Sequence, residues 1–184
     1  MFRENPILTY TNTLFYPLAP REEEVKLEDI AHALSQMCRA NGHFKTFYSV
    51  AQHCINCAKE AAARELSSKM QLACLLHDAS EAYLADVTRP VKYYLADYQN
   101  IERRLQHIIF SKFEIGVLNA QELKHLADID NALLAYEFKH LHHRPIFEAD
   151  YQLLTVPDLS ERDMRMVEKE FIILAKEIMR KMAG

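Results

Sequence analysis

Glycine and proline are scarce in this sequence, which has three glycines and six prolines among 184 residues. This scarcity argues against a β-sandwich, whose many tight turns depend on such residues. Leucine, alanine, glutamate and lysine, which favour helices, are abundant instead. A hydrophobic content of 49% in a chain of this length is enough for one sizeable core. We therefore predict an all-α protein with a single compact domain over residues 1–184.

The sequence also lacks any apolar run near the ~18 residues of a membrane span. Its first residues, Met1 to Pro6, do not include the apolar block of a signal peptide. We therefore expect a cytoplasmic protein without a membrane partner. The net charge of −4 gives no general attraction for nucleic acid, so we expect no nucleic-acid partner, and a phosphorylated substrate would need local cationic groups.

Four cysteines occur without a secretory signal, which predicts reduced thiols. Cys54 and Cys57 form a C-x-x-C motif, a spacing found in redox and zinc sites. Both residues fall inside a helical pattern, where a free cysteine behaves as a small buried apolar residue. We favour this structural interpretation of the motif.

The pattern of apolar residues divides the chain into three parts. Residues 1–26 are predicted to form an extended or β-hairpin arm, 27–143 a metal-binding helical core, and 144–184 a C-terminal helix with its connection. Helices are predicted over 27–40, 49–66, 69–84, 97–113, 119–143 and 160–182. Ser49 and Gln52 form a capping box at the second of these helices, and Ser160 is the expected N-cap of the last.

The segment around residue 77 places polar side chains on a helix that is otherwise apolar. At about 100° per residue, Glu81 lies about 40° around the helix from His77 and about 60° from Asp78, so the three share one face. A bound cation would compensate their desolvation in a core helix. A histidine nitrogen beside a carboxylate oxygen suits Mn²⁺, Co²⁺, Fe²⁺, Zn²⁺ or Mg²⁺, so the sequence predicts one divalent metal ion without identifying it.

Two further ligands are expected on neighbouring helices. His53 lies one turn into the helix that Ser49 opens, beside apolar residues, and is predicted to point inward. On the helix over 119–143, Asp130 shares its face with five leucines, whereas Asp128 lies about 160° away. A carboxylate among leucines is costly unless it is paired or bound to a metal, so Asp130 is the candidate ligand and Asp128 a solvated charge.

The order His53, His77-Asp78 and Asp130, with spacings of 24 and 52 residues, resembles the H…HD…D signature of the HD-domain superfamily of metal-dependent phosphohydrolases. The neighbouring segments resemble the 5′-nucleotidase branch of that superfamily. These segments are Tyr48 to His53, His77 to Glu81, Asp86 and Pro90-Val91-Lys92. The likeness covers about residues 28–137 and extends to the arm over 12–21, and it implies a helical HD-domain bundle.

The resemblance implies a role for each matching residue. The expected ligands of the cation are His53, His77, Asp78 and Asp130. Glu81 would act as the acid/base residue that orients the attacking water, and Asp86 would be a second catalytic carboxylate. Arg39 resembles the arginine that such nucleotidases place on the substrate. The implied substrate is a small-molecule phosphate ester, a (deoxy)nucleoside 5′-monophosphate.

Physical chemistry agrees with these roles. Metal coordination lowers the pKa of bound water and offsets charge on phosphoryl oxygens. Phosphoryl transfer then needs mainly positioning and positive charge. Arg39 offers planar bidentate donors for this purpose. The other cations that compete for the role are Lys92, Arg89 and Lys45, and Lys92 is the second substrate-binding residue that we select.

Three alternatives stay open at this level. The same four ligands also suit a phosphodiesterase or another nucleotide hydrolase. A non-catalytic module that binds a nucleotide or a metal and regulates a partner is a second possibility, although it would not need Glu81 and Asp86. A zinc-thiol switch built from Cys54, Cys57 and Cys74 is the third. The apolar stripe that begins at Ile101 is either core or the seam of a homodimer.

Overall fold

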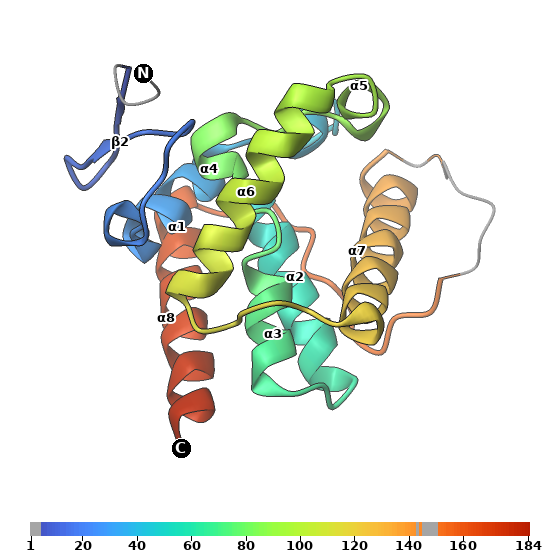
Figure 1. Ribbon diagram of the computed structural model, residues 1–184. Coiled ribbons are helices and arrows are strands. Elements are labelled where there is room, and N and C mark those ends of the chain that lie inside the picture. The colour runs from blue at the N-terminus through green and yellow to red at the C-terminus, as the bar shows by residue number, and fades with distance from the viewer. Residues whose placement is uncertain (1–4, 143, 145–150) are drawn as a thin grey trace.

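The computed structural model describes residues 5–142, 144 and 151–184, and the expected all-α fold is confirmed (Figure 1). A small hairpin precedes the helices, with β1 (Ile7–Leu8) antiparallel to β2 (Leu14–Phe15). Asp29, a buried carboxylate on the first helix, accepts hydrogen bonds from Thr9 Oγ1 at 2.8 Å and from the backbone N–H of Thr11 at 2.7 Å. This anchors the N-terminal arm to the helical body.

Eight α-helices follow within the described residues. They are α1 (Leu27–Gln36), α2 (Val50–Ala63), α3 (Ser68–Leu75), α4 (Glu81–Leu84), α5 (Arg89–Lys92), α6 (Ala96–Lys112), α7 (Ala120–Leu141) and α8 (Met164–Ala183). Two short 3₁₀ turns, η1 (Glu22–Glu24) and η2 (Arg39–Gly42), flank α1. Across the described part of the chain, none of these helices has the length and apolar content needed to cross a bilayer.

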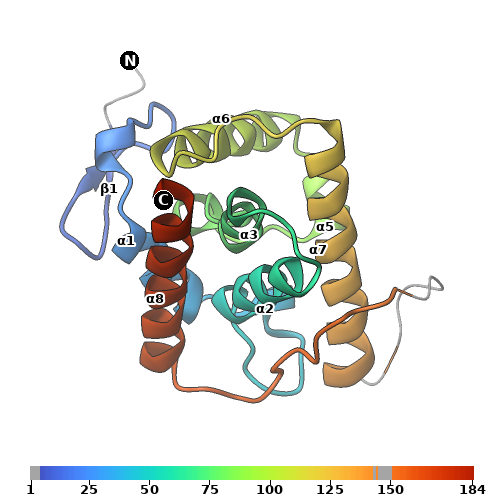
Figure 2. The same cartoon turned by 90° about the horizontal axis from the view of Figure 1, so that it is seen from below.

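The paired helices α2 and α3 lie at the centre, between α8 on one side and α7 on the other (Figure 2). Their apolar side chains form the core together with α1 and α8, and Ile55, Leu72 and Phe171 are fully buried there. Leu105 and Ile109 of α6 join the same core, which explains the apolar stripe of that helix. Because α7 packs on α2 and α3, polar side chains on the facing sides of these helices must meet.

The predicted helix over 69–84 is wrong, because the chain leaves the helical path after Leu75 and forms the separate short helix α4. A distant side chain stabilises the break. Gln106 of α6 donates a hydrogen bond to the carbonyl of Leu76 at 2.7 Å and accepts one from the backbone N–H of Ser80 at 3.2 Å. These bonds satisfy backbone groups that a continuous helix would have paired internally. After the break, His77 Nε2 lies 3.9 Å from Asp130 Oδ1 on α7.

The predicted ends of other helices also change. The helix expected over 27–40 stops at Gln36, because residues 38 and 49 form a β-bridge and the chain then turns through η2. In η2, Gly42 has a φ of 74°, which is the left-handed conformation that glycine adopts readily. The last helix begins at Met164 with Asp163 as its N-cap rather than Ser160. The helix expected over 119–143 ends at Leu141, and residue 143 lies outside the described residues.

Candidate metal centre

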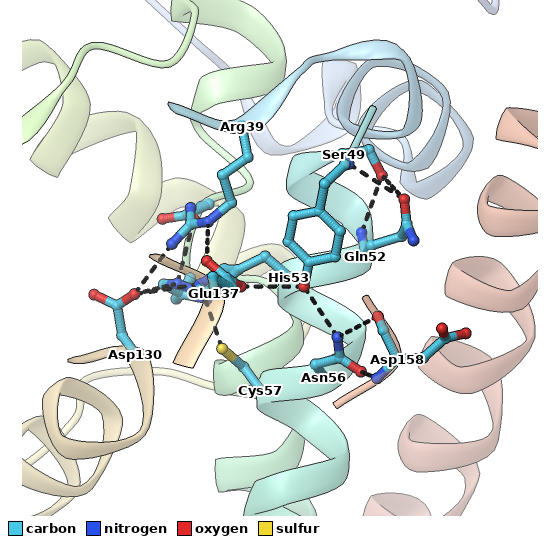
Figure 3. Close-up of polar contacts among 12 residues, drawn as sticks. Arg39, Ser49, Gln52, His53, Asn56, Cys57, Asp130, Glu137 and Asp158 are labelled. Atoms are coloured by element: carbon cyan, nitrogen blue, oxygen red, sulfur yellow. Dashed lines mark hydrogen bonds and ion pairs between the residues drawn. The ribbon is translucent and has the colours of Figure 1, made fainter. Parts of the chain in front are cut away.

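His53 reaches the centre of the molecule from the start of α2. The predicted capping box is confirmed: Ser49 Oγ accepts from the backbone N–H of Gln52 at 3.1 Å, and Gln52 Oε1 accepts from the backbone N–H of Ser49 at 3.2 Å. These bonds satisfy two backbone groups at the helix start. His53, one turn later, is fully buried, as predicted. Its Nε2 lies 3.2 Å from Asp130 Oδ1 on α7 (Figure 3).

Both imidazole rings are held through Nδ1. His53 Nδ1 lies 2.6 Å from Glu137 Oε1, and His77 Nδ1 lies 2.9 Å from the carbonyl oxygen of Cys74. A carbonyl or carboxylate oxygen only accepts, so each Nδ1 carries a proton, and Nε2 is the nitrogen of each ring that faces the carboxylates of Asp130 and Asp78. His77 Nε2 is buried, and no hydrogen-bond partner for it occurs in the part of the chain described. Metal-binding histidines are commonly held in this way.

The structure brings the four predicted ligands together from three segments. His77 Nε2 lies 3.3 Å from Asp78 Oδ2 and 3.9 Å from Asp130 Oδ1. The ring centroids of His53 and His77 are 5.3 Å apart. The unpaired Nε2 of His77, two imidazoles and two carboxylates fit a divalent cation of borderline or hard character.

The choice of Asp130 over Asp128 agrees with the geometry. The side chain of Asp128 is 48% exposed and pairs with Lys124 across one turn, whereas that of Asp130 is 22% exposed and faces the two imidazoles. Burial alone would raise the pKa of Asp130, but the contact with His53 and the positive charges of His53 and His77 hold this pKa well below its usual value. Asp130 is therefore an anion at neutral pH, as a ligand must be.

Three buried cysteines lie behind the imidazoles. Cys57 Sγ is 3.4 Å from His53 Nε2, and the ligand atoms of His53, Cys57 and His77 lie within 4.8 Å of one another. Cys54, His77 and Asp78 form a second such group. Burial raises the pKa of Cys54 to about 11 and that of Cys74 to about 12, which keeps these thiols protonated and weakens them as ligands. The described residues thus contain His, Cys and Asp groups that can hold a metal ion.

The two predicted catalytic carboxylates line a cavity of about 690 Å³ beside these groups. Glu81 is 4% exposed, and its Oε2 has no hydrogen-bond partner among the residues described. Burial, together with the charges of Asp78 and Asp86, raises the pKa of Glu81 to about 9. The pKa of Asp86 is raised as well, mainly by burial. At neutral pH, and without a bound cation, the Glu81 carboxyl group therefore carries a proton.

Cationic side chains surround the same cavity. Arg39 NH1 lies 3.4 Å from Asp78 Oδ2, and its NH2 lies 3.6 Å from Asp130 Oδ1. Arg89 NH2 reaches the second oxygen of Asp130 at 3.0 Å. Lys92 Nζ lies 2.7 Å from Glu102 and 3.6 Å from Glu81, so two carboxylates share its charge.

Leu134 and Phe138 of α7 contribute apolar surface to the wall of the same cavity. Lys45, the fourth cation considered from the sequence, is exposed and is not part of the cavity wall. The cavity wall therefore combines charged and apolar side chains.

Sequence reasoning missed Glu137, which is fully buried on α7. It contacts His53 and also accepts from Arg39 Nε at 2.9 Å. Burial opposes the charged form, but the positive charges of His53 and Arg39 lower the pKa of Glu137. A signal was present, because seven residues separate Asp130 from Glu137 and rotate them by only about 20° on a helix. Arg89 was not selected from the sequence; its side chain is 61% exposed, and it lies 3.0 Å from Asp130, 41 positions away.

Comparison with known protein sequences places the chain in a family. No protein-family model matches it. It is 35% identical to the uncharacterized protein RCAP_rcc00048 of Rhodobacter capsulatus over 113 residues, which span 58% of this chain and 57% of that protein. It is 32% identical to the uncharacterized protein YfdR of Escherichia coli over 135 residues, which span 73% of this chain and 71% of YfdR. On this likeness the protein belongs to the same family as YfdR.

Proposed function

We propose that the protein is a metal-dependent phosphohydrolase of the HD-domain type that removes phosphate from (deoxy)nucleoside 5′-monophosphates. The observation that carries this proposal is the pair of imidazoles, fully buried in His53 and 9% exposed in His77, each held through Nδ1 by an oxygen acceptor. Their Nε2 atoms face the carboxylates of Asp130 and Asp78. In such an arrangement each Nε2 could give up a proton and bind a cation.

One divalent cation, Mn²⁺, Co²⁺, Fe²⁺, Zn²⁺ or Mg²⁺, is the proposed cofactor. The residues that would hold it are His53, His77, Asp78 and Asp130. When bound, such an ion supplies Lewis acidity, which acidifies water and offsets negative charge on a phosphoryl group. The carboxylates of Asp78 and Asp130 also keep Arg39 beside the ligands. The guanidinium can therefore meet a phosphate that lies next to them.

Glu81 is the proposed acid/base residue. Its unpaired Oε2 can accept a proton from the attacking water, and its Oε1 lies 3.6 Å from the ammonium of Lys92. A bound cation would oppose the effect of Asp78 and Asp86 and lower the pKa of Glu81, so that the ionised carboxylate could take this proton. An acid/base residue is most effective when its pKa lies near the working pH. Asp86 on the same wall would return a proton to the departing oxygen.

The cavity suits a nucleotide in size and chemistry. A volume of about 690 Å³ lies within the usual range of small-molecule sites. Arg39, Arg89 and Lys92 supply positive charge for a phosphate, while Leu134 and Phe138 supply apolar surface for a base. Positive charge and positioning are the main requirements of phosphoryl transfer.

The test is hydrolysis of a panel of nucleotides with added Mn²⁺ or Co²⁺, measured as free phosphate for monophosphates and as ring-opened monophosphate for cyclic diesters. We expect hydrolysis of 5′-monophosphates and much slower hydrolysis of 3′-monophosphates and of cyclic diesters. Activity on diesters alone would replace the nucleotidase proposal with a phosphodiesterase, and no hydrolysis of either class would reject both. The four free cysteines suit a reducing compartment, so we further propose that this activity belongs to the cytoplasm.

A further inference from the structure

Glu137 is a fully buried carboxylate that three segments of the chain contact at once. Its Oε1 lies 2.6 Å from His53 Nδ1 and accepts from Tyr48 OH at 3.1 Å. Its Oε2 accepts from Arg39 Nε at 2.9 Å. Figure 3 shows this carboxylate between the guanidinium of Arg39 and the ring of His53. Each oxygen thus serves a different part of the candidate site.

The two oxygens have separable consequences. The bond to Oε1 requires a proton on His53 Nδ1, because a carboxylate only accepts, so Nε2, on the Asp130 side, is the nitrogen that can bind a cation. The bond to Oε2 fixes the plane of the Arg39 guanidinium, whose two remaining nitrogens then point at Asp78 and Asp130. Burying an ionised glutamate costs free energy. The contacts of Glu137 with His53 and Arg39 must offset this cost for the carboxylate to remain ionised in the core.

We propose that Glu137 is a positioning residue that sets the tautomer of His53 and the orientation of Arg39 through one carboxylate. It would thereby link the metal-binding face of the site to the group that receives the phosphate. This consequence for catalysis rests on the proposed function. The tautomer itself does not, so the two ideas can fail separately.

The first experiment uses the unaltered protein without added metal. Long-range ¹H–¹⁵N spectra of the histidine rings are recorded at a pH where imidazoles are neutral, and the His53 signals are identified by their loss in His53→Gln. We expect His53 to be protonated at Nδ1. A ring protonated at Nε2 instead would overturn the inference, whatever the protein's activity.

The second experiment uses Glu137→Gln, which keeps the shape of the side chain but offers one oxygen and one NH₂ group. If the oxygen faces His53, the NH₂ meets the Nε–H of Arg39, and KM for the nucleotide should rise about 10-fold while Zn²⁺ affinity is kept. If the amide turns over, its NH₂ faces Nδ1, and the ring proton must move to Nε2. Zn²⁺ affinity should then fall by about 10- to 100-fold.

Glu60→Gln is the matched control. Glu60 is also a fully buried glutamate, on the same helix as His53, but it accepts from the backbone N–H of Leu154 at 3.0 Å and of Thr155 at 2.9 Å. This variant should lose thermal stability and keep the His53 tautomer, the Zn²⁺ affinity and KM. If Glu137→Gln behaves like this control, with all three quantities unchanged within about twofold, Glu137 is merely structural and the inference is wrong.

A failure of the proposed function has a different signature. If the unaltered protein binds none of Mn²⁺, Co²⁺, Fe²⁺, Zn²⁺ and Mg²⁺, the phosphohydrolase proposal fails, yet the Nδ1 proton of His53 in that same sample still supports the inference about the tautomer. Conversely, metal-dependent phosphate release with His53 protonated at Nε2 keeps the function and overturns the role of Glu137.

Discussion

Asp130 and Glu137 lie seven residues apart on α7 and contact opposite nitrogens of one ring: Asp130 Oδ1 is 3.2 Å from His53 Nε2, and Glu137 Oε1 is 2.6 Å from His53 Nδ1. Two turns of a single helix therefore provide an anion beside Nε2 of the imidazole and an acceptor for its Nδ1–H. Two carboxylates on one face of α7 thus have different roles: Asp130 is the candidate ligand, and Glu137 positions the ring. Substitutions can test these roles separately.

Asp130→Asn should remove the metal, and Asp128→Asn should not. The first change replaces an anionic ligand with a neutral amide, so we expect divalent-metal affinity to fall by more than about 100-fold. Asp128 lies on the same helix with its side chain 48% exposed, which makes it a matched control for charge and helix effects. Elemental analysis and metal titration measure both variants, and equal metal content in the two would contradict the ligand assignment.

Glu81→Gln should keep the metal and lose turnover. The variant preserves size but cannot take a proton from water, so kcat should fall by about 10²- to 10⁴-fold. Metal content and nucleotide affinity should stay close to those of the unaltered protein, because the predicted ligands are other residues. Full turnover in this variant would contradict the acid/base role. Nucleotide binding without turnover in the unaltered protein would favour a regulatory module.

The pKa of Glu81 also predicts a pH dependence of stability in protein stripped of metal. The folded-state value of about 9 exceeds the ordinary value of 4.5, so between these pH values the folded chain holds a proton that the unfolded chain has released. The free energy of unfolding must then fall as pH rises through this interval. Urea unfolding at several pH values should show a smaller fall for Glu81→Gln, and parallel curves for the two proteins would show that Glu81 does not hold the proton.

Cys54→Ser and Cys57→Ser should retain the metal. Burial raises the pKa of both thiols, so a cation must displace a strongly held proton to bind either sulfur. We expect Co²⁺-loaded protein to lack the near-ultraviolet band that a thiolate ligand produces, and both variants to bind Co²⁺ within about threefold of the unaltered protein. Loss of metal together with such a band in the unaltered protein would instead support the zinc-thiol switch.

Much of the site could be predicted from sequence because local patterns report which face of a helix is buried. The capping box at Ser49 marked the start of α2, which placed His53 inward, and the leucines of α7 separated Asp130 from Asp128. The order of the histidines and aspartates along the chain then suggested that they meet. The scarcity of glycine and proline likewise predicted the helical fold.

Other features depend on partners that are distant in the chain. Helix α3 ends early because Gln106, 30 positions away, satisfies the carbonyl of Leu76. Glu137 is stable in the core because Arg39, 98 positions away, meets its charge. Periodicity identifies a buried face, but the free energy of a polar group on that face depends on which donor or acceptor the rest of the fold brings to it. The sequence by itself therefore determined the helical fold class and the candidate ligands, and only the tertiary structure decided where α3 ends and how those ligands are held.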